Sequence, residues 1–163
     1  MKVTKIIASV AVILILLLSP GCETEPDWIG ELTDEIFSQI NLLRTGEGLD
    51  KLVWHSELAG FAADHSRDMG VRDYFSHTTP EGKTFSERIA DSGIDYGGAG
   101  ENIYMRAGDC SDIPAEDVTA GIVDGWWNSP GHREIMIREN MTHGAVGCYQ
   151  SESALYVTFN VIN

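Results

Sequence analysis

Apolar side chains recur at helical spacing after residue 30, and they predict three helices in the first half of the domain. The first helix is expected to begin at Thr33 or Asp34, whose side-chain oxygens can cap it, and to end near Gly46. A second helix is expected over residues 56–70, and a short third helix over residues 84–91. The first two helices carry apolar faces formed by Ile36, Phe37, Ile40 and Leu43, and by Leu58, Phe61, Ala62, His65 and Met69.

The pattern changes towards the C-terminus. Residues 112–127 predict a fourth helix, and residues 145–149 predict a strand. Residues 155–161 alternate between apolar and polar side chains, which predicts a second strand with one buried face, reached by a turn at residues 150–153. Because helices come first and strands later, without regular alternation, we expect an α+β fold with an antiparallel sheet and not a doubly wound parallel sheet.

The N-terminus has the pattern of an export signal. Lys2 and Lys5 precede the apolar run of residues 6–18. This run is shorter than the ~20 residues that a membrane-spanning helix needs. We therefore expect a signal peptide over residues 1–21, with an uncleaved N-terminal anchor as the alternative.

The segment that ends this run resembles a lipobox, the site where a prolipoprotein is cut before a cysteine that then carries lipid. Gly21 stands before Cys22 as that pattern requires, but Ser19 occupies the place of the usual large apolar residue. The resemblance implies lipid attachment at Cys22, a linker over residues 22–32 and a domain over residues 33–163. The alternative is a simple secretory signal with an unpaired Cys22. The protein is expected at the outer face of the cell membrane or secreted, touching the membrane only through this anchor.

The charge of the chain excludes some partners. It has 25 acidic and 11 basic residues, a formal net charge of −14. So acidic a surface repels nucleic acids and anionic lipid head groups. Outside the cytosol, Cys110 and Cys148 are expected to form a disulfide, with two free buried thiols as the alternative.

Three residues stand out as candidates for chemistry. His77 follows a short aromatic segment, Glu101 follows a glycine-rich stretch, and His132 follows a Pro-Gly turn. Two imidazoles and a carboxylate can hold Zn²⁺ or another divalent metal, or perform acid–base chemistry without a metal. The alternatives are a surface loop for His77, a buried arginine partner for Glu101 and a helix cap for His132. His65 lies on an apolar helix face, which favours a hydrogen-bonded core residue.

These three segments occur in the order and rough spacing of prokaryotic CAP (SCP-like) domains, which the chain resembles over residues 33–163. Further agreement comes from residues 41–44, 52–54 and 63–69. The resemblance implies an α-β-α sandwich around an antiparallel sheet, and a cleft lined by two histidines and two acids. By motif these are His77, Glu101 and His132, while Ser129 stands at the place of the second acid. Asp124 and Glu134 are the candidates to replace that acid.

The incomplete set of acids favours binding over catalysis. We expect an extracellular binding module whose cleft takes a lipid, a peptide or another surface protein, with divalent-metal binding at His77 and His132. The alternative is a metal- or histidine-dependent extracellular hydrolase that uses His77, Glu101 and His132. A third hypothesis is a structural role in the cell envelope. Arg44 and Arg88 are expected to be structural, paired with buried acids or carbonyls.

Overall fold

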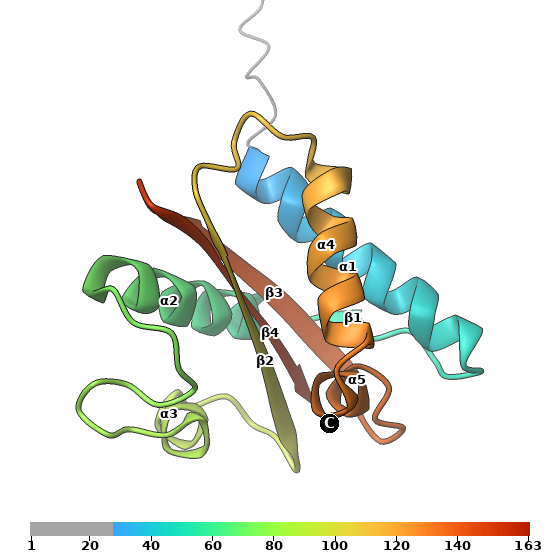
Figure 1. Ribbon diagram of the computed structural model, residues 1–163. Coiled ribbons are helices and arrows are strands. Elements are labelled where there is room, and N and C mark those ends of the chain that lie inside the picture. Colours follow the sequence, from blue (N-terminus) through green and yellow to red (C-terminus); the bar gives the residue numbers. More distant parts are fainter. Residues whose placement is uncertain (1–27) are drawn as a thin grey trace, which may run out of the picture.

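The computed structural model describes residues 28–163 and shows a sheet between two layers of helices (Figure 1). One layer contains α1, α4 and α5, and the other contains α2 and α3. This arrangement confirms the expected α+β three-layer fold. The helices are α1 (Trp28–Gly46), α2 (Ser56–Arg72), α3 (Phe85–Asp91), α4 (Ala115–Trp127) and α5 (Pro130–Met136). The strands are β1 (Val53–Trp54), β2 (Ala99–Ala107), β3 (His143–Gln150) and β4 (Ala154–Ile162).

The four strands lie in the order β1-β3-β4-β2. β4 pairs antiparallel with both β2 and β3, as expected, whereas the two-residue β1 joins β3 in parallel. β2 is therefore an outer strand. Its free edge is partly covered, because Nε1 of Trp126 donates to the Ile103 carbonyl at 3.0 Å and Nη1 of Arg138 donates to the Ala99 carbonyl at 3.4 Å.

The central strand β4 is buried on both faces, which corrects the expected half-buried strand. Leu155, Val157, Phe159 and Val161 pack in one cluster with apolar residues of α1 and α4. On the other face Tyr156, Thr158 and Asn160 are also buried, because α2 and the loops around it cover them. The alternating apolar and polar residues of β4 therefore face two different buried layers, and neither face is exposed to solvent.

Helix α2 lies directly on β3. An added Cβ at Gly147 would meet the backbone nitrogen of Ala63 at 2.1 Å, so only glycine allows this approach. The hydroxyl of Ser66 donates to the Gly147 carbonyl at 2.8 Å and lies 2.8 Å from Oγ1 of Thr158. The middle of α2 is thus held against the sheet by both backbone contact and hydrogen bonds.

Several boundaries differ from those expected. α1 begins at Trp28, before the expected caps, because the Trp28 indole donates to the Ile113 carbonyl at 2.9 Å and Leu32 is buried. The strand β2 and the helix α5 were not expected.

The signal peptide and Cys22 lie outside the described residues. Within residues 28–163, no helix is both long and apolar enough to cross a membrane.

The expected disulfide between Cys110 and Cys148 is absent, and both cysteines are free and buried. Each sulfur has its own surroundings. Sγ of Cys110 lies 3.8 Å from the Gly108 carbonyl, and Cys148 bonds to Thr33. The alternative of two free buried thiols therefore holds in this structure.

Candidate functional site

His77 and Glu101 meet where the loop after α2 crosses β2. Nδ1 of His77 lies 2.9 Å from Oε1 of Glu101. An ionised carboxylate only accepts hydrogen bonds, so Nδ1 of His77 carries the proton and Nε2 keeps its lone pair. The side chain of His77 is 48% exposed, whereas that of Glu101 is 1% exposed. The ring of His77 is therefore accessible to solvent, whereas its carboxylate partner is not.

The Glu101 carboxylate is fully engaged by its neighbours. Nη2 of Arg88 donates to both oxygens, at 2.8 and 2.9 Å, and Nδ2 of Asn160 donates to Oε2 at 3.2 Å. Burial by itself raises the pKa of Glu101, but the bond from His77 and the charge of Arg88 outweigh it and lower that pKa. Glu101 is thus the buried partner of an arginine, as one alternative held, and also the anchor of His77.

The side chain of Arg88 packs against two aromatic rings on its way to Glu101. Its guanidinium lies over the ring of Phe61 at 5.3 Å and over that of Phe85 at 5.7 Å. It also donates to the His77 carbonyl at 3.3 Å. The expected structural role of Arg88 is therefore confirmed. The same holds for Arg44, which is buried and donates to carbonyls of Asp50, Met136, Arg138 and Met141.

The second histidine is held by the residue at the place of the missing acid. Nδ1 of His132 lies 2.8 Å from Oγ of Ser129. Ser129 stands at the N-cap of α5 but forms no side-chain cap bond there. Glu134 instead pairs with Arg138, and Asp124 lines a separate hollow between α1 and α4. A neutral hydroxyl, and not a substitute acid, therefore orients His132.

Both histidines are tied to neighbouring residues of β2. Glu101 faces the α2–α3 layer and bonds to the ring of His77, whereas Nδ2 of Asn102 donates to the His132 carbonyl at 2.9 Å. Burial lowers the pKa of His132, and a positive charge on His77, when that ring is protonated, lowers it further. We call His77 and His132 together the His77–His132 site. Glu101 thus bonds to the ring of His77, whereas the next residue of the strand bonds to the backbone of His132.

His65 also belongs to this neighbourhood, although the sequence indicated only a core residue. It is 3% exposed, and its Nε2 lies 3.1 Å from the Ser76 carbonyl and 4.0 Å from Oε1 of Glu101. Burial lowers the pKa of His65, although the charge of Glu101 acts in the opposite direction. Its position on an apolar helix face gave no signal of this contact. Asn102 was missed because strand β2 itself was not expected, and Asn160 because the polar face of β4 was expected to be exposed.

Two imidazole nitrogens are the candidate metal ligands of this site. Nδ1 of each histidine has an orienting partner, so Nε2 is the ring nitrogen without a hydrogen bond among the described residues. At His132, Nε2 has a free lone pair in the tautomer in which Nδ1 donates to Oγ of Ser129. Within the described part of the chain, no three histidine, cysteine or acidic side chains form a group able to hold a metal. Any ion would therefore have two imidazole ligands and complete its coordination with water or a ligand.

A hollow of about 940 Å³ lies between α2 and α3. Its wall includes His65 and Arg88, but not His77, Glu101 or His132. This hollow is therefore not lined by the predicted cleft residues, although Arg88 touches both the hollow and Glu101.

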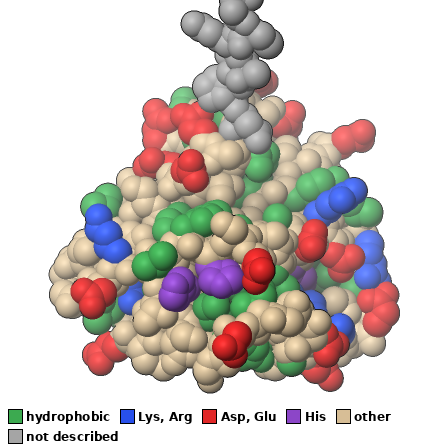
Figure 2. Space-filling model, turned by 180° about the vertical axis from the view of Figure 1, so that it is seen from behind, with side chains coloured by type: hydrophobic (Ala, Val, Ile, Leu, Met, Phe, Trp, Pro, Cys, Tyr) green, Lys and Arg blue, Asp and Glu red, His purple; other side chains and the backbone are tan. Residues whose placement is uncertain are grey.

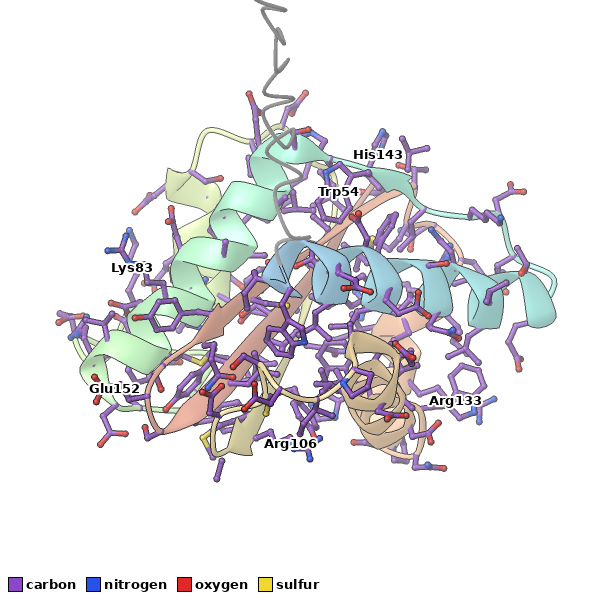
Figure 3. All side chains as sticks on the ribbon, turned by 90° about the horizontal axis from the view of Figure 1, so that it is seen from above. Trp54, Lys83, Arg106, Arg133, His143 and Glu152 are labelled. Carbon is purple, nitrogen blue, oxygen red and sulfur yellow. The ribbon has the colours of Figure 1, made fainter. Side chains whose placement is uncertain are left out.

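A second pair of histidines lies at the opposite edge of the sheet. The rings of His55 and His143 meet edge to face with centroids 5.8 Å apart. His143 and Trp54 lie on the same side of the molecule (Figure 3), and two adjacent histidine side chains appear on the face seen from behind (Figure 2). Nδ1 of His55 accepts from the Leu58 amide and caps α2. This pair provides an internal comparison for the His77–His132 site.

The chain has recognisable relatives. It is 34% identical over 134 residues to the uncharacterized membrane protein YlbC of Bacillus subtilis, which covers 80% of this chain and 36% of that protein. A solved extracellular protein with an SCP domain from Bacillus anthracis is 31% identical, with a TM-score of 0.69, covering 85% of this chain and 44% of that one. The chain thus spans less than half the length of both proteins.

The fold is shared more widely. The structure of NaASP2 with Zn²⁺ has a TM-score of 0.59 and 14% identity to this chain, covering 84% of this chain and 82% of that one. The family described as CAP, the cysteine-rich secretory protein family, matches residues 37–162. Because this match covers most of the domain and agrees with the three-layer fold, the chain belongs to the CAP family.

Proposed function

We propose that this protein is an exported binding module that holds a divalent cation such as Zn²⁺ between His77 and His132. The observation that carries the proposal is the shared arrangement of the two rings. Each is oriented through Nδ1, by Glu101 or by Ser129, and each keeps Nε2 free. A carboxylate behind a histidine increases its strength as a ligand and fixes its tautomer. NaASP2, which is similar in fold, has been solved with Zn²⁺.

Binding is favoured over hydrolysis by the state of Glu101. A general base needs a lone pair within reach of a substrate or a water molecule. Both oxygens of Glu101 instead accept bonds from Arg88, and its side chain is 1% exposed. Ser129 replaces the second acid of the family pattern. Among the described residues of the site, this leaves imidazoles that can bind but no accessible carboxylate.

We further propose that the domain works outside the cell, attached to the membrane by lipid on Cys22. Support comes from the export pattern of residues 1–21 and from the extracellular protein of Bacillus anthracis that the chain resembles. The lipid, peptide and surface-protein ligands expected of such a module remain predictions. A bound metal with open coordination positions would offer such a ligand a direct point of attachment.

Isothermal titration calorimetry of the metal-free domain with Zn²⁺ tests the proposal. We expect one weak site in the wild type, lost in His77→Ala and in His132→Ala. The matched control is His143→Ala, which removes an imidazole at the opposite edge of the sheet and should leave this site intact. Equal binding by the wild type and by the double variant of His77 and His132 would show that the site does not hold the metal.

A further inference from the structure

We infer that His65 is a positioning residue, which fixes the backbone that carries His77 and so aims the His77 ring at the site. Its only hydrogen bond among the described residues joins Nε2 to the Ser76 carbonyl, at 3.1 Å, one residue before His77. A carbonyl only accepts, so Nε2 of His65 carries the proton. The inference deepens the proposed function, and it rests on that function only for its consequence for metal binding.

An imidazole at position 65 lowers the stability of the fold, which indicates that it has a role other than packing. Nδ1 of His65 is buried and has no hydrogen-bond partner in the described chain. An unsatisfied buried polar atom costs stability, and an apolar side chain of similar shape avoids that cost. Neighbouring positions on the same helix face, Leu58, Ala62 and Met69, are apolar and fully buried. Stability of the core alone therefore does not explain an imidazole at this position.

His65 stands on a rigid support. Residues 62–66 of α2 lie against β3 at Gly147, where an added Cβ would collide with backbone. Ser66, next to His65, bonds to the Gly147 carbonyl at 2.8 Å. A group held by a packed helix can transmit its position to a loop more accurately than another loop residue can. His65 thus connects the sheet to the loop that carries His77.

Three elements together hold His77. Nε2 of His65 on α2 bonds to the Ser76 carbonyl, Nη2 of Arg88 on α3 donates to the His77 carbonyl at 3.3 Å, and Glu101 on β2 accepts from the His77 ring. Arg88 and Glu101 also bond to each other, so their contributions are coupled. His65 is the one of the three that makes no hydrogen bond to the other two. Its removal should therefore release the loop while leaving the Arg88–Glu101 pair in place.

The test compares two substitutions of His65 by amide side chains of different length. In His65→Gln the amide nitrogen can extend as far as Nε2 of the imidazole and donate to the Ser76 carbonyl, whereas in His65→Asn it is too short. Nitrogen-15 NMR of the histidine rings in the metal-free protein reports the tautomer of His77. We expect His77 to carry its proton on Nδ1 in the wild type and in His65→Gln, and to become a mixture of tautomers in His65→Asn.

The consequence for metal binding is a separate measurement. Loss of an orienting group behind a metal ligand typically weakens affinity by about 10–100-fold. We expect a loss of this size for Zn²⁺ in His65→Asn and a smaller loss in His65→Gln. If the wild type does not bind Zn²⁺, the proposed function fails, but the NMR comparison still decides the role of His65.

Two results would overturn the inference. One is an unchanged His77 ring spectrum in His65→Asn. The other is an equal disturbance in the Gln and Asn variants that extends to His143 at the far edge of the sheet, because this would indicate general loosening of the fold. The free energy of unfolding of each variant, measured with urea, identifies such loosening directly.

Discussion

The hydroxyl of Ser129 lies 2.8 Å from Nδ1 of His132, so a neutral side chain holds the second histidine where the family pattern has an acid. This contact takes the place of the N-cap bond that a serine usually forms at the start of a helix. The first prediction follows from the absence of charge at this position. In Ser129→Glu, a carboxylate beside the ring would stabilise the imidazolium and raise the pKa of His132.

An NMR titration of the His132 ring measures this effect, with Ser129→Ala as the control that removes the hydroxyl without adding charge. A pKa of His132 that is the same in Ser129→Glu and Ser129→Ala would show that residue 129 does not face the ring in solution.

A second prediction concerns the buried Glu101. Glu101→Gln removes the charge that compensates Arg88, whose side chain is 10% exposed. Breaking a buried pair by neutralising one partner typically costs about 3–5 kcal/mol. Urea unfolding should show a loss of this size. The control is Asp91→Asn, which breaks the exposed pair with Lys83 and should cost less than about 1 kcal/mol. Similar losses in both variants would contradict the assignment of Glu101 as the central buried charge.

The third prediction is a dependence of stability on pH that His65 contributes. Burial lowers the pKa of folded His65 below its ordinary value of 6.5, so the unfolded chain binds this proton more readily. The stabilisation is complete above pH 6.5 and is lost as the pH falls towards the folded pKa. The lowered pKa of Glu101 adds a further loss below pH 4.5. Urea unfolding of the metal-free protein between pH 7.5 and 5 should show a smaller slope in His65→Leu than in the wild type. Equal slopes would contradict the prediction.

A fourth prediction tests the contact between α2 and the sheet. Gly147→Ala places a methyl group 2.1 Å from the Ala63 nitrogen, and both partners are backbone in packed elements. Overpacking of a tight core typically costs about 1–3 kcal/mol, and this site has little freedom to relax. Gly121→Ala on α4 is the matched control, because a Cβ there meets nothing within 4 Å and should stabilise the helix by about 0.5–1 kcal/mol. A neutral Gly147→Ala would show that α2 lies further from β3.

A fifth prediction concerns the two buried cysteines. Burial raises the pKa of Cys148 to about 12, and burial also raises the pKa of Cys110. Because the thiolate is the reactive form, alkylation should leave both thiols unmodified in the folded protein and modify both after unfolding. Intact-mass measurement of a Cys22→Ser variant reads out the result. A gain of two hydrogens on reduction would reveal a disulfide and contradict this structure.

Much of the fold could be predicted from periodicity, because α2 and β4 carry strong patterns over many residues. β2 was hidden because polar Glu101 and Asn102 follow glycines, and those side chains are buried only by partners that are distant in the sequence. α5 is short and begins at a proline, so it carries little helical signal. The prediction of an exposed face on β4 was wrong because the sequence does not show which layer covers each side of a sheet.

The order of short segments selected His77, Glu101 and His132 as candidates. The structure shows the contacts of each residue, and their role in one shared site stays a prediction. The sequence could not reveal that Arg88 occupies both oxygens of Glu101, since this depends on how α3 is placed against the sheet. His65 was hidden for a related reason: an imidazole within an apolar helix face looks the same whether it faces the core or a functional loop.

The outer strands have a consequence for how copies of this protein behave beside one another. Side chains of Arg138 and Trp126 already occupy two carbonyls along the outside of β2, and β1 pairs with the first two residues of β3 at the other margin. Exposed strand margins are the usual templates for aggregation, and here part of each margin is already covered. Many copies could therefore crowd together on a surface and remain separate molecules.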